Sequence, residues 1–86
     1  MAHQLVITKQ ARKDLEKLPP KLARRIIDKL GFYASAPDPL SFAKWLKDDI
    51  EAPFRFSMFR DYRAKFSVRN NVIQIQRIGH RKDIYG

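Results

Sequence analysis

Cysteine is absent from these 86 residues, which excludes disulfide bonds and thiolate metal sites. No apolar run approaches the roughly 20 residues of a membrane span, and the first residues lack the pattern of a signal peptide. We therefore expect a cytoplasmic protein with no membrane-bound part. A chain of this length forms one domain, residues 1–86, around one small core.

Acidic residues are scarce: nine Asp and Glu stand against eighteen Lys and Arg, a formal net charge of +9. A small domain with that excess of positive charge binds polyanions. Nucleic acid is the first candidate, because neutralised phosphates release condensed counterions. An acidic protein is the second and a membrane surface the third. A soluble basic protein without such a partner is the remaining alternative.

Carboxylates cluster in one place only, at Asp48, Asp49 and Glu51. They lack the regular ligand spacing of a calcium loop. We interpret them as a polar loop and expect neither a metal nor a cofactor. In the same poorly patterned stretch, residues 40–52, we expect Trp45 and Leu46 to anchor the chain to the core. Lys44 and Lys47 are expected to border the functional site.

The first half of the chain predicts a strand and two helices. Residues 3–7 are β-prone and apolar, and Thr8 is a good N-cap for a helix after them. Pro19 and Pro20 end that helix, and Pro20 can begin a second one that extends to about residue 36. The tight turn predicts an antiparallel helical hairpin. Its basic faces are either solvated surface or additional phosphate contacts.

The second half predicts three strands, because apolar and polar residues alternate over residues 54–58, 62–69 and 73–78. Asn70 and Asn71 suit a hairpin turn, since asparagine tolerates positive φ. The predicted class is α+β: an N-terminal strand and a helical hairpin packed on an antiparallel sheet (β-α-α-β-β-β). The final residues are expected to form no C-terminal helix.

Strand alternation also sorts the side chains into two faces. One polar set is predicted to share the open face of the sheet: Arg55, Ser57, Arg63, Lys65, Ser67, Gln74 and Gln76. Continued in step, this face would include Ile78 and then His80. Arg77 is in phase with the apolar set and would point to the scaffold or its edge. Gly79 is expected to allow a bend or bulge that redirects His80 and Arg81.

This open face offers groups that can cleave RNA without a metal. Arg55, Arg63 and Arg81 can hold phosphate oxygens, because the guanidinium fork matches them. His80 can carry a proton. Tyr85 could orient or deprotonate a 2′-hydroxyl if nearby cations lowered its pKa. The alternatives are that the arginines only bind an acidic partner, that His80 is a turn residue, and that Tyr85 is a core or edge aromatic.

Four pieces of sequence in this order resemble the RelE/ParE toxin superfamily. They are Phe54-Arg55-Phe56, Asp61-Tyr62-Arg63, Arg77-Ile78-Gly79-His80-Arg81 and Asp83-Ile84-Tyr85. The first helix and its turn agree through Thr8, Ala11, Asp14-Leu15, Lys17-Leu18 and Pro19.

The resemblance implies the toxin of a type II toxin–antitoxin system. It further implies an endoribonuclease that cuts mRNA in the ribosomal A site and is neutralised by a cognate antitoxin, acidic overall, wrapped on the basic face. By resemblance Arg63, Arg81, Tyr85 and His80 are catalytic. The implied phosphate- and RNA-binding residues are Arg55, Lys65, Lys47, Arg77 and Lys82. Ser57 and Arg60 depart from the pattern, since some members have a second basic residue at the first position and the family usually has a glycine at the second.

Two other functions remain open at this stage. One is a ParE-like toxin that inhibits DNA gyrase by binding, without nuclease activity. The other is a non-catalytic RNA-binding module that uses the same face. The joint presence of Arg63, His80, Arg81 and Tyr85 favours cleavage over gyrase inhibition. Alanine at Arg81 would separate cleavage from binding alone, because a catalyst would lose cleavage and keep most of its RNA affinity.

Overall fold

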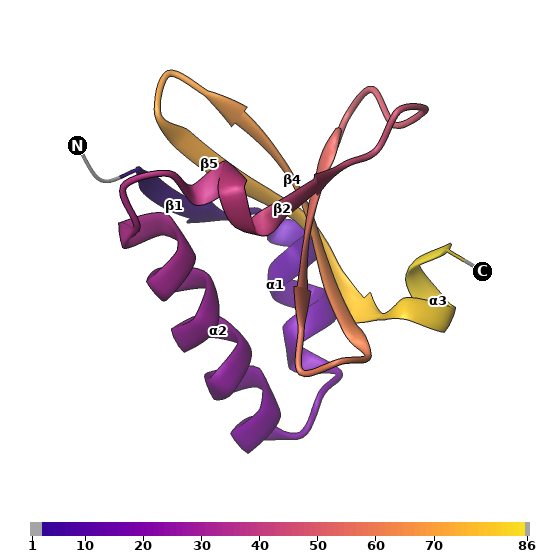
Figure 1. Ribbon diagram of the computed structural model, residues 1–86. Coiled ribbons are helices and arrows are strands. Elements are labelled where there is room, and N and C mark those ends of the chain that lie inside the picture. Colours follow the sequence, from indigo (N-terminus) through magenta and orange to yellow (C-terminus); the bar gives the residue numbers. More distant parts are fainter. Residues whose placement is uncertain (1–2, 86) are drawn as a thin grey trace.

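The computed structural model describes residues 3–85 (Figure 1). In chain order the elements are β1 (Gln4–Ile7), α1 (Lys9–Glu16), α2 (Pro20–Ser35), the 3-10 helix η1 (Pro39–Phe42), β2 (Ala43–Trp45), β3 (Phe54–Met58), β4 (Tyr62–Arg69), β5 (Val72–His80) and α3 (Arg81–Tyr85). The predicted α+β class with a helical hairpin is confirmed. Strand β2 and helix α3 were not predicted, and the expectation of no C-terminal helix is wrong.

The two long helices begin where their local sequence predicts. The Thr8 hydroxyl accepts a hydrogen bond from the main-chain N–H of Ala11 (3.3 Å) and donates one to the carbonyl of Ile75 (2.7 Å). Thr8 therefore caps α1 and also fastens it to β5. Helix α2 starts with Pro20, whose missing N–H has no partner to lose in a first turn.

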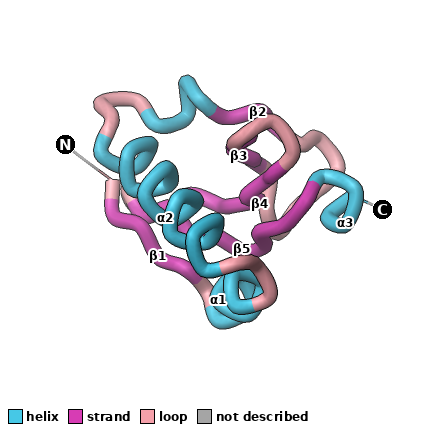
Figure 2. Tube along the Cα trace, turned by 90° about the horizontal axis from the view of Figure 1, so that it is seen from below, coloured by secondary structure: helices cyan, strands magenta, loops and turns pink. Residues whose placement is uncertain are grey.

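The sheet has five strands in the order β1-β5-β4-β3-β2. Strands β2 to β5 are antiparallel neighbours, whereas β1 pairs with β5 in parallel. The sheet is thus mixed rather than purely antiparallel. The helical hairpin connects β1 to the rest of the sheet, and a parallel neighbour requires such a long crossover. Figures 1 and 2 show α1 and α2 on one side of the sheet.

The core lies between this side of the sheet and the two helices. Phe56 and Phe66 are fully buried and stacked, with ring centroids 4.2 Å apart. Tyr33 of α2 stacks on Phe56 at 4.5 Å. The opposite face of the sheet, called the open face below, carries the alternate residues of β3, β4 and β5.

One extra residue in β5 changes which side chains reach the core. Lys65 pairs with Arg77 while its neighbour Phe66 pairs with Ile75, so Gln76 is a bulge. Beyond it Ile78 is buried in the core (3% exposed), and Arg77 lies opposite Lys65. The prediction that Ile78 lies on the open face is wrong, because it assumed unbroken alternation. Arg77 pairs with Lys65, yet its Nε reaches Asp14 of α1, so it contacts the scaffold at the sheet edge as expected. The bulge is at Gln76 and not at Gly79, which remains in register opposite Arg63.

Two hairpin turns place residues at positive φ. Asn70 (φ 51°) and Asn71 (φ 63°) form the predicted turn between β4 and β5. Between β3 and β4, Phe59 (φ 48°) and Arg60 (φ 72°) also adopt the left-handed conformation. The guanidinium of Arg25, on α2, lies 4.5 Å from the centre of the Phe59 ring.

The segment between α2 and β3 differs from expectation. Trp45 is 63% exposed on the edge strand β2 and does not anchor the segment. Leu46 is partly buried but is not part of the core cluster. Ala52, at 3% exposure, is the buried residue of the loop after β2.

Candidate nucleic-acid interface

Four cations lie in one row across the open face. Strand register pairs Lys44 of β2 with Arg55 of β3, Arg55 with Lys65 of β4, and Lys65 with Arg77 of β5. We call these four residues the cationic row. Like charges directly opposite one another destabilise a sheet unless counter-charges are present. The row is therefore a local concentration of positive charge that favours an anionic ligand.

A second row, two residues along the strands, contains Arg63. This arginine lies opposite Ser57 on one side and Gly79 on the other. One terminal nitrogen of its guanidinium donates to the carbonyls of Arg60 (2.9 Å) and Tyr62 (3.0 Å). Arg63 thus also fixes the strained turn between β3 and β4.

Arg81, the first residue of α3, is attached to the same turn. Its main-chain N–H donates to the carbonyl of Asp61 (2.7 Å), and its Nε lies 3.6 Å from an Asp61 carboxylate oxygen. The structure therefore attaches Arg63 and Arg81, the two predicted catalytic arginines, to residues 60–62. Half of the Arg81 side chain is exposed (54%), which leaves the guanidinium accessible.

His80 does not share the open face with these arginines. It pairs with Tyr62, and the two rings meet edge to face with centroids 5.6 Å apart. Its Nδ1 accepts a hydrogen bond from the main-chain N–H of Lys82 (3.1 Å), in the first turn of α3. The predicted placement of His80 with the polar set is wrong, for the same reason as for Ile78. His80 instead supports the start of α3.

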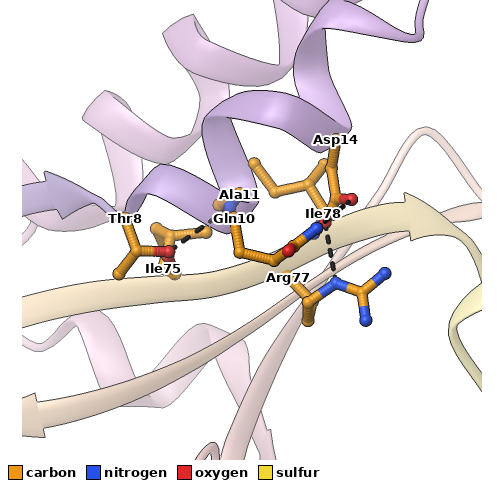
Figure 3. Close-up of polar contacts among 7 residues, drawn as sticks. All are labelled: Thr8, Gln10, Ala11, Asp14, Ile75, Arg77 and Ile78. Carbon is orange, nitrogen blue, oxygen red and sulfur yellow. Dashed lines mark hydrogen bonds and ion pairs between the residues drawn. The ribbon is translucent and has the colours of Figure 1, made fainter.

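Arg77 is bound to a buried carboxylate. Asp14 of α1, 6% exposed, accepts hydrogen bonds from Arg77 Nε (2.9 Å) and from the main-chain N–H of Ile78 (2.9 Å) (Figure 3). Burial alone would raise the pKa of Asp14, but these hydrogen bonds outweigh it and the pKa lies below its usual range. Strand β1 ends opposite Ile75, so Asp14 caps the part of the β5 edge that β1 leaves unpaired.

Lys65 is bound to the loop between β2 and β3. Its Nζ forms an ion pair with Asp49, and hydrogen bonds from Lys65 and from the Ala52 N–H hold the pKa of Asp49 below its usual range. Lys47 lies in the same loop and lines a cavity together with Lys65. Sequence reasoning missed the roles of Asp14, Asp49 and Asp61. Asp14 and Asp61 lie in the segments that resemble the toxin superfamily, and Asp49 lies in the acidic cluster, but nothing local in the sequence indicated which cation each one binds.

The last predicted residues lie on α3, at the far end of β5 (Figure 1). Lys82 is exposed. Tyr85 is the final residue of α3, and its side chain lies outside the described part of the structure. The position of α3 beside the β3–β4 turn places its backbone at the Arg63 end of the open face.

The chemistry available on this surface is electrostatic. Among residues 3–85, no group of three or more His, Cys, Asp or Glu could hold a metal ion. No helix in the described range is long and apolar enough to cross a membrane. Guanidinium and ammonium groups can bind phosphates and stabilise charge that develops on them.

Comparison with known proteins identifies the family. Residues 5–85 match the family profile described as "ParE toxin of type II toxin-antitoxin system, parDE". The search of curated proteins found no match.

Solved structures agree on the fold. The chain is similar to a chain of the toxin–antitoxin complex RelBE2 from Mycobacterium tuberculosis, with a TM-score of 0.81, 25% identity, and coverage of 94% and 93% of the two chains. It is also similar to a chain of the archaeal RelE–RelB complex from Pyrococcus horikoshii OT3, with a TM-score of 0.70, 28% identity, and coverage of 94% and 97%. A domain-wide profile match and this shared fold together show that the chain belongs to the RelE/ParE family of type II toxin–antitoxin toxins.

Proposed function

We propose that this toxin is an endoribonuclease that cuts mRNA in the ribosomal A site by attack of the 2′-hydroxyl, without a metal. The observation that supports it best is the cationic row beside Arg63 and Arg81. Six basic side chains on or next to one sheet face, in a chain of net charge +9, suit the backbone of a single-stranded nucleic acid.

The proposed reaction needs only substrate atoms and side chains. The 2′-oxygen forms a bond to the neighbouring phosphorus, and the bond from phosphorus to the 5′-oxygen breaks. The 2′ proton leaves to a base, for which the family resemblance suggests Tyr85, and the departing 5′-oxygen takes a proton from solvent water, so that one proton is removed and one supplied. The products are a 2′,3′-cyclic phosphate and a 5′-hydroxyl. Arg63 and Arg81 stabilise the charge on the phosphate oxygens during transfer.

His80 has a different role in this proposal from the one first expected. Its Nδ1 accepts a hydrogen bond from the Lys82 N–H and is therefore not available to the substrate while that bond exists. It then supports the helix that carries Arg81 and Tyr85. Only Nε2 remains available to exchange a proton with substrate.

A cognate antitoxin is part of the proposal, because the similar solved chains come from toxin–antitoxin complexes. An acidic segment that folds on the open face would cover the cationic row and Arg63. Such complementarity speeds association and selects the partner. It would also block the RNA site.

A second candidate is inhibition of DNA gyrase by binding alone. The observation that favours it is the family profile, which is that of ParE toxins. Under this alternative the basic surface contacts protein, and neither Arg63 nor Arg81 takes part in catalysis.

The deciding experiment is cleavage of a defined mRNA in EDTA, with and without programmed ribosomes, followed by end-group analysis. Ribosome-dependent cuts with 2′,3′-cyclic phosphate ends support the proposal. In the same assay Arg81→Ala should slow cleavage by roughly 10²–10³-fold, the usual cost of one charge-stabilising group. Intact RNA from folded, antitoxin-free toxin, together with inhibited supercoiling by gyrase, would replace the nuclease by the second candidate.

A further inference from the structure

The acidic loop after β2 is an ordered structure rather than a free tether. Its ends are joined by a hydrogen bond from the Leu46 N–H to the Pro53 carbonyl. Inside it, one Asp49 carboxylate oxygen accepts from the Ala52 N–H (2.9 Å), and Ala52 is buried. The loop therefore presents the second Asp49 oxygen in a defined direction.

That second oxygen contacts the cationic row. Lys65 Nζ lies 2.5 Å from Asp49 Oδ2, and both side chains are mostly buried (19% and 25% exposed). A cavity between the loop and the sheet is lined by Glu51 and Pro53 on one side and by Ser67, Gln74 and Gln76 on the other. The loop thus borders the open face and carries a carboxylate to the third cation of the row.

The two carboxylates that reach the row differ in how firmly they are attached. Asp14 is buried, and its bond to the Ile78 N–H is part of the sheet edge. Asp49 belongs to a loop whose neighbours Asp48, Ile50 and Glu51 are exposed. Asp14 is therefore a permanent partner of Arg77, whereas Asp49 can leave Lys65 without breaking a strand or a helix.

We propose that Lys65, together with its strand neighbour Arg55, forms a phosphate-binding subsite that Asp49 occupies in the free toxin, so that the acidic loop competes with RNA for the open face. A carboxylate and a phosphate are recognised by the same charge-assisted hydrogen bonds. The loop makes the toxin bind RNA more weakly than its charge alone would allow. This inference depends on the RNA-binding part of the proposed function, but not on cleavage.

The test is binding of a fluorescently labelled single-stranded RNA with 2′-O-methyl groups, which cannot undergo 2′-hydroxyl attack. Asp49→Asn removes the charge while its amide oxygen can still accept from the Ala52 N–H. It should tighten binding roughly two- to fivefold, the size expected for releasing one partly exposed ion pair. Asp48→Asn is the matched control: it changes the same charge one residue away, on an exposed side chain outside the observed ion pairs, and should leave the affinity unchanged.

A double-mutant cycle shows whether the effect passes through Lys65. In a Lys65→Met background, Asp49→Asn should give no gain. An equal gain in RNA affinity in that background, or an equal gain from Asp48→Asn, would mean that only net charge matters. Either result would overturn the proposal that Asp49 occupies a phosphate-binding subsite at Lys65. Binding by wild type with no gain from Asp49→Asn overturns the competition while leaving RNA binding intact. Absence of RNA binding by every variant overturns the proposed function as well.

Discussion

Replacing Asp14 by alanine should be one of the most damaging changes to a polar residue in this protein. The carboxylate connects α1 to Arg77 and to the buried N–H of Ile78. Without it the Ile78 N–H has no partner, at a cost of about 1–3 kcal/mol. The lost ion pair adds at most about 1 kcal/mol, because the Arg77 side chain is 51% exposed and water can replace the carboxylate.

The expected loss in the free energy of unfolding is therefore about 1–4 kcal/mol. For a domain of this size that corresponds to a melting temperature lower by roughly 4–30 °C. Asp14→Asn should cost about half as much, since its amide oxygen can still accept from Ile78. Arg77→Met should cost no more than about 1 kcal/mol, because it removes only the exposed ion pair.

Lowering the pH should remove the stability that the Asp14 carboxylate contributes. The pKa of Asp14 is lower in the folded protein than in the unfolded chain, because hydrogen bonds to Arg77 and Ile78 outweigh the opposing effect of burial. The stability that this shift contributes is complete above the unfolded pKa, near 4, and is lost as pH falls through the folded pKa. Stability curves of wild type and Asp14→Asn should therefore converge as the pH falls below about 4.

Urea denaturation at pH 7 and at several lower pH values measures all three variants. The expected order of destabilisation is Asp14→Ala, then Asp14→Asn, then Arg77→Met. The reasoning is refuted if Asp14→Ala costs less than about 0.5 kcal/mol, or if Arg77→Met costs as much. In either case the Ile78 N–H would not depend on this carboxylate.

Four further outcomes follow from local geometry. Arg60→Gly should stabilise the protein by up to about 1 kcal/mol and raise the melting temperature slightly. The reason is that φ 72° strains any residue with a side chain, and the greater freedom of glycine in the unfolded chain offsets only part of the strain that is relieved. Conversely, Arg60→Val should lower the melting temperature, and no difference between the two variants would contradict the turn geometry. Phe66→Ala should cost about 3–5 kcal/mol by leaving a cavity beside a stacked ring, and near-native stability in urea would show that the core can collapse there. His80→Ala should accelerate hydrogen exchange of the Lys82 amide with little change in global stability, whereas unchanged exchange would mean that the ring does not cap α3.

Local sequence patterns were sufficient to predict most of the helices, strands and turns. Thr8 as a cap, Pro20 as a first-turn residue and the Asn70–Asn71 turn each depend on the chemistry of one or two residues, and each was predicted correctly. The polar set of β3 and β4 was also predicted correctly, because alternation has a fixed period of two. The choice of catalytic and RNA-binding residues came from the family resemblance. Their catalytic roles stay predictions.

Errors arose where a residue's position depends on a distant partner. The bulge at Gln76 depends on how β5 meets β4, and one extra residue moves Ile78 from the open face to the core. Trp45 was expected to anchor its segment to the core, but the edge strand β2 leaves it exposed. In the sequence Asp14 is one of several polar helix residues. Its partners Arg77 and Ile78 are 63 and 64 positions further along the chain, and only the fold brings them together.

By itself, then, the sequence determined the periodicities, caps and turns, the positive charge, and the membership of basic residues in one strand face, since all of these depend on neighbours within a few positions. Tertiary structure alone decided the parallel pairing of β1 with β5, the phase of β5 beyond its bulge, and the carboxylates bound to Arg77, Lys65 and Arg81. These features require segments far apart in the chain to meet. Ion-pair partners in particular are chosen by proximity in space, for which the order of residues gives no local signal.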